Sequence, residues 1–300
     1  MKAKLSITKS YPAESGHKGI PGHRGGSLPG NATGGNTTAK VTVKKPKVYL
    51  PYNTQGNDTY TKFRLPDGSW TPERQALHDE IKKKIFAGKT PVSTPVSYVL
   101  GGGTASGKST LLKSGRVTLP ENIVTVDADV IKGMLPEYSE SLAKNDVSAA
   151  AFVHEESSYL AKSIAAEAAA NSYNVVLDGT GDNSIASISK KVESLRELGQ
   201  SVMGIYVTSD VDVAIERSIA RAIRTGRYVP ESVIRFNHAS VSNVFPKIIE
   251  KGLFDNLQLY DTSSGEVVLV GSGSRSKFKV IDPAAYARFL SKAISGAEVS

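Results

Sequence analysis

Short apolar runs alternate with longer amphipathic stretches along the chain from residue 96 onward. The apolar runs predict β-strands at residues 96–100, 123–126, 174–177, 202–207 and 257–260. Apolar residues at helical spacing predict helices at residues 108–114, 148–171, 185–198, 211–224, 230–251 and 283–294. Strands that alternate with helices favour a parallel sheet with helices on both faces, so we expect an α/β fold.

The residues ahead of this pattern divide into two parts. Residues 11–40 carry too few apolar side chains to offset the entropy of folding, and residues 41–70 are basic, so we expect a disordered or extended basic region at 1–70. Thr71 as N-cap and Pro72 at the first helical position begin a helix that Gly88 ends. We therefore expect a helix and linker at 71–94 and a separate domain at 95–300.

Positive charge is concentrated near the N-terminus. Residues 1–90 carry 16 Lys and Arg against 6 Asp and Glu, whereas the remaining residues carry 21 against 23. A basic arm indicates contact with a polyanion such as nucleic acid, although a solvated tail has the same composition. The chain has no cysteine, which excludes disulfides and cysteine-based zinc sites. No apolar run is long enough to span a membrane and no secretory signal is visible, so we expect a cytoplasmic protein.

A phosphate-binding motif follows the first predicted strand. Residues 102–109 read Gly-Gly-Thr-Ala-Ser-Gly-Lys-Ser and fit the pattern G-x-x-x-x-G-K-[ST]. In such a loop the backbone N–H groups face the phosphates, the lysine contacts the outer phosphates and the last hydroxyl ligates Mg²⁺. A chance glycine turn is the alternative. The pattern predicts binding of ATP or another nucleoside triphosphate, with Mg²⁺, by Gly102, Gly103, Thr104, Ala105, Ser106, Gly107, Lys108, Ser109 and Thr110.

Acidic residues follow the second and third predicted strands. Asp127 and Asp129 come after the second strand, and Asp178 and Thr180 come after the third. Because ligands bind beyond the carboxyl ends of parallel strands, these residues should converge on the triphosphate. A carboxylate there can accept the proton of an attacking hydroxyl, which favours a catalytic role for at least one aspartate of the first pair, with helix capping as the alternative. The sequence at 178–181 resembles the D-x-x-G of GTPases, but no N-K-x-D motif follows.

A series of arginines lies on and after the fourth predicted helix, at Arg217, Arg221, Arg224 and Arg227. Their spacing places them along one helix face, from which they can close over a triphosphate and neutralise charge in the transition state. A solvated basic face is the alternative.

The sequence His154-Glu155-Glu156 lacks the H-E-x-x-H spacing of a metal site. Its residues form either an ordinary helix face or, through Glu155 and Glu156, part of a pocket for the substrate. His238 is more typical of a structural residue.

Several ordered stretches resemble the zeta-toxin family of phosphate-loop kinases, which is similar to phage polynucleotide 5′-kinases and chloramphenicol phosphotransferases. Besides the phosphate loop they are found at residues 126–129, 136–138, 173–181, 215–217, 227–230, 252–254 and 259–261. The resemblance implies that Asp129 is the general base, that Lys108 and Ser109 hold the triphosphate and Mg²⁺, and that Asp178 organises substrate or metal. It also implies lid arginines, which Arg217 and Arg227 match best.

Zeta toxins phosphorylate the 3′-hydroxyl of UDP-N-acetylglucosamine, and a small antitoxin protein neutralises them. The family glutamate that helps to hold the amino sugar falls here at Lys162. We therefore expect a small nucleotide-containing acceptor other than UDP-N-acetylglucosamine itself, either a similar nucleotide sugar or a molecule like NAD. By the same resemblance, an antitoxin is an expected partner.

Three functions stay open at this point. The first is an ATP- and Mg²⁺-dependent kinase that acts as a toxin or a phage-encoded effector. The second is a polynucleotide 5′-kinase whose basic N-terminal region delivers it to nucleic acid. The third is a non-enzymatic phage structural or packaging protein with a nucleotide site. The third rests on the glycine-rich residues 16–27, which resemble a motif of phage head-morphogenesis proteins and predict association with a capsid.

Overall fold

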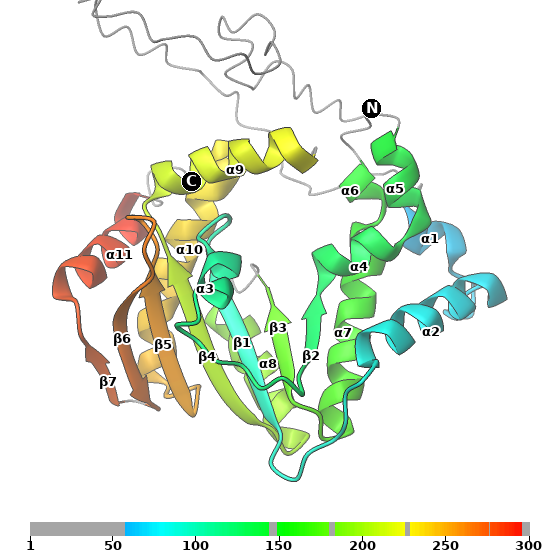
Figure 1. Cartoon of the computed structure of the whole chain (residues 1–300), viewed down its shortest axis with the longest axis horizontal. Helices are drawn as coiled ribbons and strands as arrows, with labels where there is room; N and C mark the ends of the chain where they lie inside the picture. Colours follow the sequence, from blue (N-terminus) through cyan, green and yellow to red (C-terminus); the bar gives the residue numbers. More distant parts are fainter. Residues whose placement is uncertain (1–57, 144–148, 180–183, 226–228, 276, 296–300) are drawn as a thin grey trace, which may run out of the picture.

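A seven-stranded sheet organises the computed structural model, which describes residues 58–143, 149–179, 184–225, 229–275 and 277–295, without the side chains of 222–225 and 294–295. The strand order is β2-β3-β1-β4-β5-β6-β7 (Figure 1). The first five strands are parallel: β1 (Val96–Gly102), β2 (Val124–Asp127), β3 (Val175–Asp178), β4 (Ser201–Thr208) and β5 (Asn256–Asp261). The prediction of an α/β fold with a largely parallel sheet is therefore confirmed.

Two antiparallel strands that the sequence pattern did not predict extend the sheet beyond β5. They are β6 (Val268–Ser274) and β7 (Lys277–Val280). Gly271 and Gly273 interrupt the apolar alternation of β6, and the alternation in β7 covers only four residues, so neither gave a clear strand pattern.

The helices alternate with the parallel strands as expected, with differences after β2. They are α1 (Thr59–Phe63), α2 (Pro72–Phe86), α3 (Lys108–Lys113), α4 (Ala128–Met134), α5 (Pro136–Ala143), α6 (Ala149–Phe152), α7 (His154–Ala170), α8 (Ile185–Glu197), α9 (Val211–Thr225), α10 (Glu231–Glu250) and α11 (Pro283–Ser295). The single helix predicted at 148–171 is divided at Val153 into α6 and α7. Short α1, α4 and α5 were not predicted, and α1 lies within the region at 1–70 that we expected to be disordered or extended. The predicted start of α2 is confirmed, because Thr71 accepts a hydrogen bond from the Arg74 N–H and Pro72 is the first helical residue.

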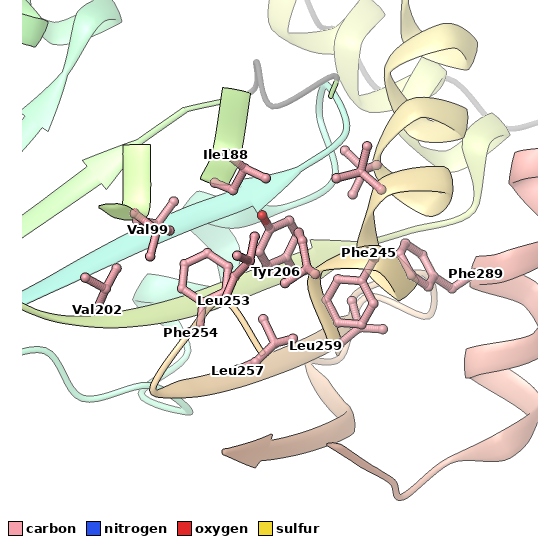
Figure 2. Packing of buried hydrophobic residues seen from close by; sticks show 14 of the residues in the cluster. Val99, Ile188, Val202, Tyr206, Phe245, Leu253, Phe254, Leu257, Leu259 and Phe289 are labelled. Carbon is pink, nitrogen blue, oxygen red and sulfur yellow. The ribbon is translucent and has the colours of Figure 1, made fainter. Parts of the chain in front are cut away.

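Successive side chains of β4 point to opposite faces of the sheet, and helices pack on both faces. Ile205 and Val207 pack with Leu111 of α3, whereas Tyr206 packs on the other face with helices α8, α10 and α11. Figure 2 shows Tyr206 beside Phe245 of α10, with Phe289 of α11 on the far side of Phe245. A third cluster of buried residues joins α2, α4, α5 and α7 to β2. The loop between β1 and α3 is thus held between two packed layers.

Some predicted features lie outside the described residues. They are residues 1–57 of the basic region predicted at 1–70, with its glycine-rich stretch, Thr180, Arg227 and the side chain of Arg224. Helix α2 packs against β2. The division of the chain at residues 71–94 and 95–300 stays a prediction. None of the helices within the described ranges combines the length and the apolar character needed to cross a membrane.

Candidate nucleotide and acceptor site

The phosphate loop curls tightly between the end of β1 and the start of α3. Gly102 and Gly107 have φ angles of 143° and 93°, which L-residues with side chains rarely adopt. A Cβ at Gly102 would lie 2.4 Å from the Val207 carbonyl oxygen, and one at Gly107 would lie 2.7 Å from Thr262 Oγ1. The loop therefore fits its surroundings only with glycine at both positions, as a backbone cradle for phosphates requires.

Lys108 projects toward the carboxyl end of β3. Its side chain is 10% exposed, and its Nζ lies 3.9 Å from Asp178 Oδ1. Burial lowers the pKa of Lys108, while the Asp178 carboxylate opposes that shift. Burial also raises the pKa of Asp178, and the negative charges of Asp127 and Asp129 raise it further against the effect of Lys108. The ends of β1, β2 and β3 thus bring together the lysine and three aspartates that the sequence placed at this edge.

The two aspartates after β2 have different environments. Asp127 Oδ1 accepts a hydrogen bond of 2.7 Å from the Asp129 N–H and caps α4, so the capping alternative applies to Asp127. The Asp129 side chain is 40% exposed in the first turn of α4, and its Oδ1 accepts a hydrogen bond of 3.1 Å from Lys132 Nζ. Both aspartates are partly exposed, and the structure thus assigns the cap to Asp127 and the contact with Lys132 to Asp129.

Of the four arginines predicted to form a lid, the structure describes the side chains of Arg217 and Arg221. Arg217 donates to Thr262 Oγ1 at 2.8 Å and to the Thr262 carbonyl at 2.6 Å. Thr262 Oγ1 in turn donates to the Ser106 carbonyl of the phosphate loop at 2.8 Å. Burial and then the positive charge of Arg221 lower the pKa of Lys108, so Arg221 lies near that lysine. Arg217 and Arg221 therefore both reach the nucleotide side of the site.

Glu156 occupies a different setting from the one expected for a substrate ligand. Its side chain is fully buried, and Arg74 donates to Oε1 from Nε at 2.5 Å and to Oε2 from Nη2 at 2.7 Å. His78 Nε2 lies 2.7 Å from the same Oε1. These partners overcome the effect of burial and lower the pKa of Glu156 to about 2. The structure thus corrects the expectation that Glu156 contacts substrate, because both carboxylate oxygens are engaged inside the protein.

The two residues before Glu156 are less buried. Glu155 is exposed in the first turn of α7. Burial, and then the charge of Lys132, lower the pKa of His154 to about 4, while Asp129 opposes the shift. His154 is therefore neutral at physiological pH and lies within electrostatic range of the Asp129–Lys132 pair.

The sequence did not assign several residues that contact the phosphate loop to the site. Thr262 follows β5 and joins Arg217 to the phosphate loop. Asn237 and His238 of α10 contact Thr104 in the same loop. Thr262 follows the end of another parallel strand, so the rule that ligands bind there could have drawn attention to it. The contacts of α10 depend on tertiary packing and were not accessible in the same way.

An open groove of about 470 Å³ lies beside α3. Its lining comes from α3, from the residues just after it and from the turn before β6, and consists of Thr110, Lys113, Ser114, Arg116, Gly265, Glu266 and Val267. Among the described residues, no group of three or more His, Asp or Glu side chains is arranged to hold a metal ion. A cation here would depend on oxygens of a bound nucleotide as well as on protein groups.

The parallel sheet and the glycine cradle between β1 and α3 define a phosphate-loop nucleotide-binding fold. The family model described as "Zeta toxin" matches residues 78–274. The chain therefore belongs to the zeta toxin family.

Relatives and solved structures agree with this placement. "Toxin zeta" of Streptococcus pyogenes and that of Enterococcus hirae are each 24% identical over 191 residues, which cover 62% of this chain and 66% of each relative. The chain thus spans slightly less than two thirds of these relatives. The relatives are toxins, and the predicted phage context finds no support.

Two solved structures resemble the fold. One is AvrRxo1-ORF1:-ORF2 with ATP, with a TM-score of 0.62 at 21% identity over 78% of this chain and 82% of that one. The other is the PezAT toxin–antitoxin system of Streptococcus pneumoniae, with a TM-score of 0.55 at 16% identity over 77% and 98%. At these identities the likeness concerns the fold.

Proposed function

We propose that this protein is an ATP- and Mg²⁺-dependent phosphotransferase of the zeta-toxin type. It transfers the γ-phosphate to a hydroxyl of a small nucleotide-containing acceptor. The observation that carries this proposal is the convergence of Lys108, Asp178 and Asp129 at the carboxyl ends of three adjacent strands, directly beside the glycine cradle. Family membership supports the same reaction class.

The residues divide the work of phosphoryl transfer. Residues 102–110 hold the phosphates, and Lys108 neutralises charge that develops on the transferred group. The Ser109 hydroxyl and the Asp178 carboxylate would hold Mg²⁺, which supplies charge neutralisation at the phosphates when it is bound. Asp129 accepts the proton of the acceptor hydroxyl as that oxygen forms its bond to the γ-phosphorus, while the bond from this phosphorus to the β–γ bridging oxygen breaks and ADP leaves. Arg217, Arg221, Arg224 and Arg227 are the proposed lid.

The groove beside α3 suits the nucleoside end of ATP. It begins at Thr110, within the phosphate-binding motif, and runs along the helix past Arg116 to Val267. A nucleotide whose phosphates occupy the cradle would place its base and ribose there. That one structure of similar fold carries ATP supports the choice of nucleotide.

The acceptor side is bounded by Asp129, Lys132, His154 and Glu155. The position that the resemblance gives to the amino-sugar glutamate is Lys162, and Glu156 is held inside the protein by Arg74. The buried Lys132 and the nearby charge of Lys162 favour an acceptor with phosphate groups. A molecule like NAD or a nucleotide sugar meets this requirement, and we retain Thr180 and Glu155 as proposed contacts.

An antitoxin is the proposed protein partner. The two structures of similar fold are complexes or systems with a second protein, AvrRxo1-ORF2 and the antitoxin of PezAT. A protein that covers the phosphate loop would block the reaction proposed here.

A phosphotransfer screen tests the proposal. Full-length protein, labelled ATP and Mg²⁺ are incubated separately with UDP-N-acetylglucosamine, NAD and a 5′-hydroxyl oligonucleotide. We expect label on a small nucleotide-containing acceptor, and loss of that transfer in Asp129→Asn. Transfer to the oligonucleotide alone would favour a polynucleotide kinase. Bound ATP without transfer to any of the three would contradict the acceptor class and favour a non-enzymatic nucleotide site.

A further inference from the structure

Two adjacent side chains of helix α10 donate hydrogen bonds to the first half of the phosphate loop. Asn237 Nδ2 donates to Thr104 Oγ1 at 2.8 Å, and His238 Nε2 donates to the Thr104 carbonyl at 2.9 Å. We propose that Asn237 and His238 are positioning residues that hold the loop in the conformation that accepts the nucleotide. This inference rests on the proposed function, and neither residue is expected to touch the reacting atoms.

The chemistry of His238 fixes the direction of its hydrogen bond. The residue is 2% exposed, and burial lowers its pKa to about 4 despite the hydrogen bond to Thr104. A neutral imidazole carries one proton, and a carbonyl oxygen can only accept, so that proton is on Nε2. His238 therefore acts as a fixed, uncharged donor to the loop backbone.

The backbone next to Thr104 needs such support. Ala105 has a φ of 57°, a left-handed conformation that is strained for a residue with a side chain. Strained backbone persists where its surroundings over-determine it. Here the preceding residue is held by Asn237 and His238, and the carbonyl of the following residue, Ser106, accepts a hydrogen bond from Thr262. The loop is thus restrained on both sides of its strained residue.

Close packing supports the same conclusion. A Cβ added at Gly103 would lie 2.3 Å from His238 Cδ2, so the imidazole ring packs directly against the loop backbone. Gly103 occupies a position that the phosphate-loop pattern leaves unrestricted, and the pattern therefore does not explain it. Contact with His238 does.

The test compares ATP binding in full-length variants by calorimetry with the KM for the acceptor. We expect Asn237→Ala and His238→Ala each to weaken ATP binding by about tenfold, the loss of one hydrogen bond, with the acceptor KM unchanged. His238→Gln, which keeps a side-chain N–H donor, should restore most of the affinity. Asn243→Ala is the matched control, because Asn243 is an exposed asparagine on the same helix.

The outcomes separate this inference from the proposed function. Wild-type ATP affinity in a folded Asn237→Ala protein would overturn the inference, and that variant decides if His238→Ala does not fold. An equal loss in Asn243→Ala, or no recovery in His238→Gln, would also overturn it, since packing of α10 would then be the cause. ATP binding that responds as expected without any phosphotransfer by the wild type would overturn the proposed function alone. A wild type that binds no ATP would overturn both.

Discussion

The nucleotide side and the acceptor side of this site are built in different ways. The nucleotide side consists of residues 102–110 with their supports, and most of its ligand contacts come from consecutive backbone groups of one loop. The acceptor side consists of α4, α5 and α7, and its helices are held by side chains far apart in the sequence. Arg74 of α2 pairs with Glu137 and Glu156, which lie 63 and 82 residues further along the chain. Local sequence therefore defines the first side, and tertiary contacts define the second.

The buried charges on the two sides also differ, in how far their neighbours compensate them. Glu156 is fully buried, and strong donors from Arg74 and His78 lower its pKa to about 2. Lys108 is also largely buried, but its nearest carboxylate oxygen is 3.9 Å away and its pKa is lowered by burial. A buried charge that its hydrogen-bonding partners fully compensate indicates a structural role. A buried charge that is incompletely compensated indicates a site for a ligand of opposite charge.

Substituting Lys108 and Asp129 should separate binding from chemistry. Lys108→Met should lower phosphotransfer by about 10²–10³-fold and weaken ATP binding, because it removes the charge that faces the phosphates. Asp129→Asn should lower kcat by about 10²–10⁴-fold, because it removes the general base while the cradle stays intact. Calorimetry with ATP and steady-state kinetics measure the two effects.

Stability measurements sharpen this prediction. Lys108→Met should be as stable as the wild type or more stable, because an apolar side chain replaces an incompletely compensated charge. A marked loss of stability in Lys108→Met would show that the lysine is structural. Loss of ATP binding in Asp129→Asn would place that residue on the nucleotide side and contradict its assignment as the base.

The acceptor side should respond in the opposite way when Arg74 is removed. Arg74→Ala should cost about 3–5 kcal/mol of folding free energy, because it leaves Glu156 buried with an uncompensated charge. Arg235 is the matched control, since it also pairs with two carboxylates, Glu231 and Asp212, but is 45% exposed. Arg235→Ala should cost at most about 1 kcal/mol. Equal losses in urea denaturation would contradict the distinction between fully compensated buried pairs and exposed pairs.

The sequence was sufficient to predict the parallel sheet and the nucleotide side, because both depend on short-range patterns. Apolar runs located the five parallel strands, and the glycine pattern located the loop. Because ligands bind beyond the carboxyl ends of parallel strands, we expected Asp127, Asp129 and Asp178 at one edge of the sheet, and the structure places them there. The sequence left open which of the first two aspartates caps α4, and the hydrogen bond to the Asp129 N–H answers this for Asp127.

The sequence was insufficient on the acceptor side for a physical reason. Adjacent glutamates on a helix point in different directions, so Glu155 is exposed while Glu156 is buried. Only the packing of α2 against α7 supplies the arginine and histidine that neutralise Glu156, and no local pattern links residues so far apart. The contacts of Asn237 and His238 with Thr104 were not predictable for the same reason.

Acid titration of stability should separate His154 and His238 from Glu156 by pH window. His238 has a folded pKa of about 4, below its ordinary 6.5, so the unfolded chain binds more protons between these values. Stability should therefore be lost as the pH falls from 6.5 to 4, by up to about 1.4 kcal/mol per pH unit. Glu156 has a folded pKa of about 2 against an ordinary 4.5, so its contribution should be lost as the pH falls from 4.5 toward 2.

Two variants assign these windows, and each serves as the control for the other. His154 and His238 both have a folded pKa of about 4, so His238→Gln should reduce, without abolishing, the pH dependence of stability between pH 6.5 and 4, and should leave the lower window unchanged. Glu156→Gln should flatten it below pH 4.5 only, whatever its stability at neutral pH. Urea midpoints from pH 7 to pH 3 give the slopes. If either variant altered both windows, the two sides would be coupled during unfolding, and the comparison between a local loop and a separately held helix layer would fail.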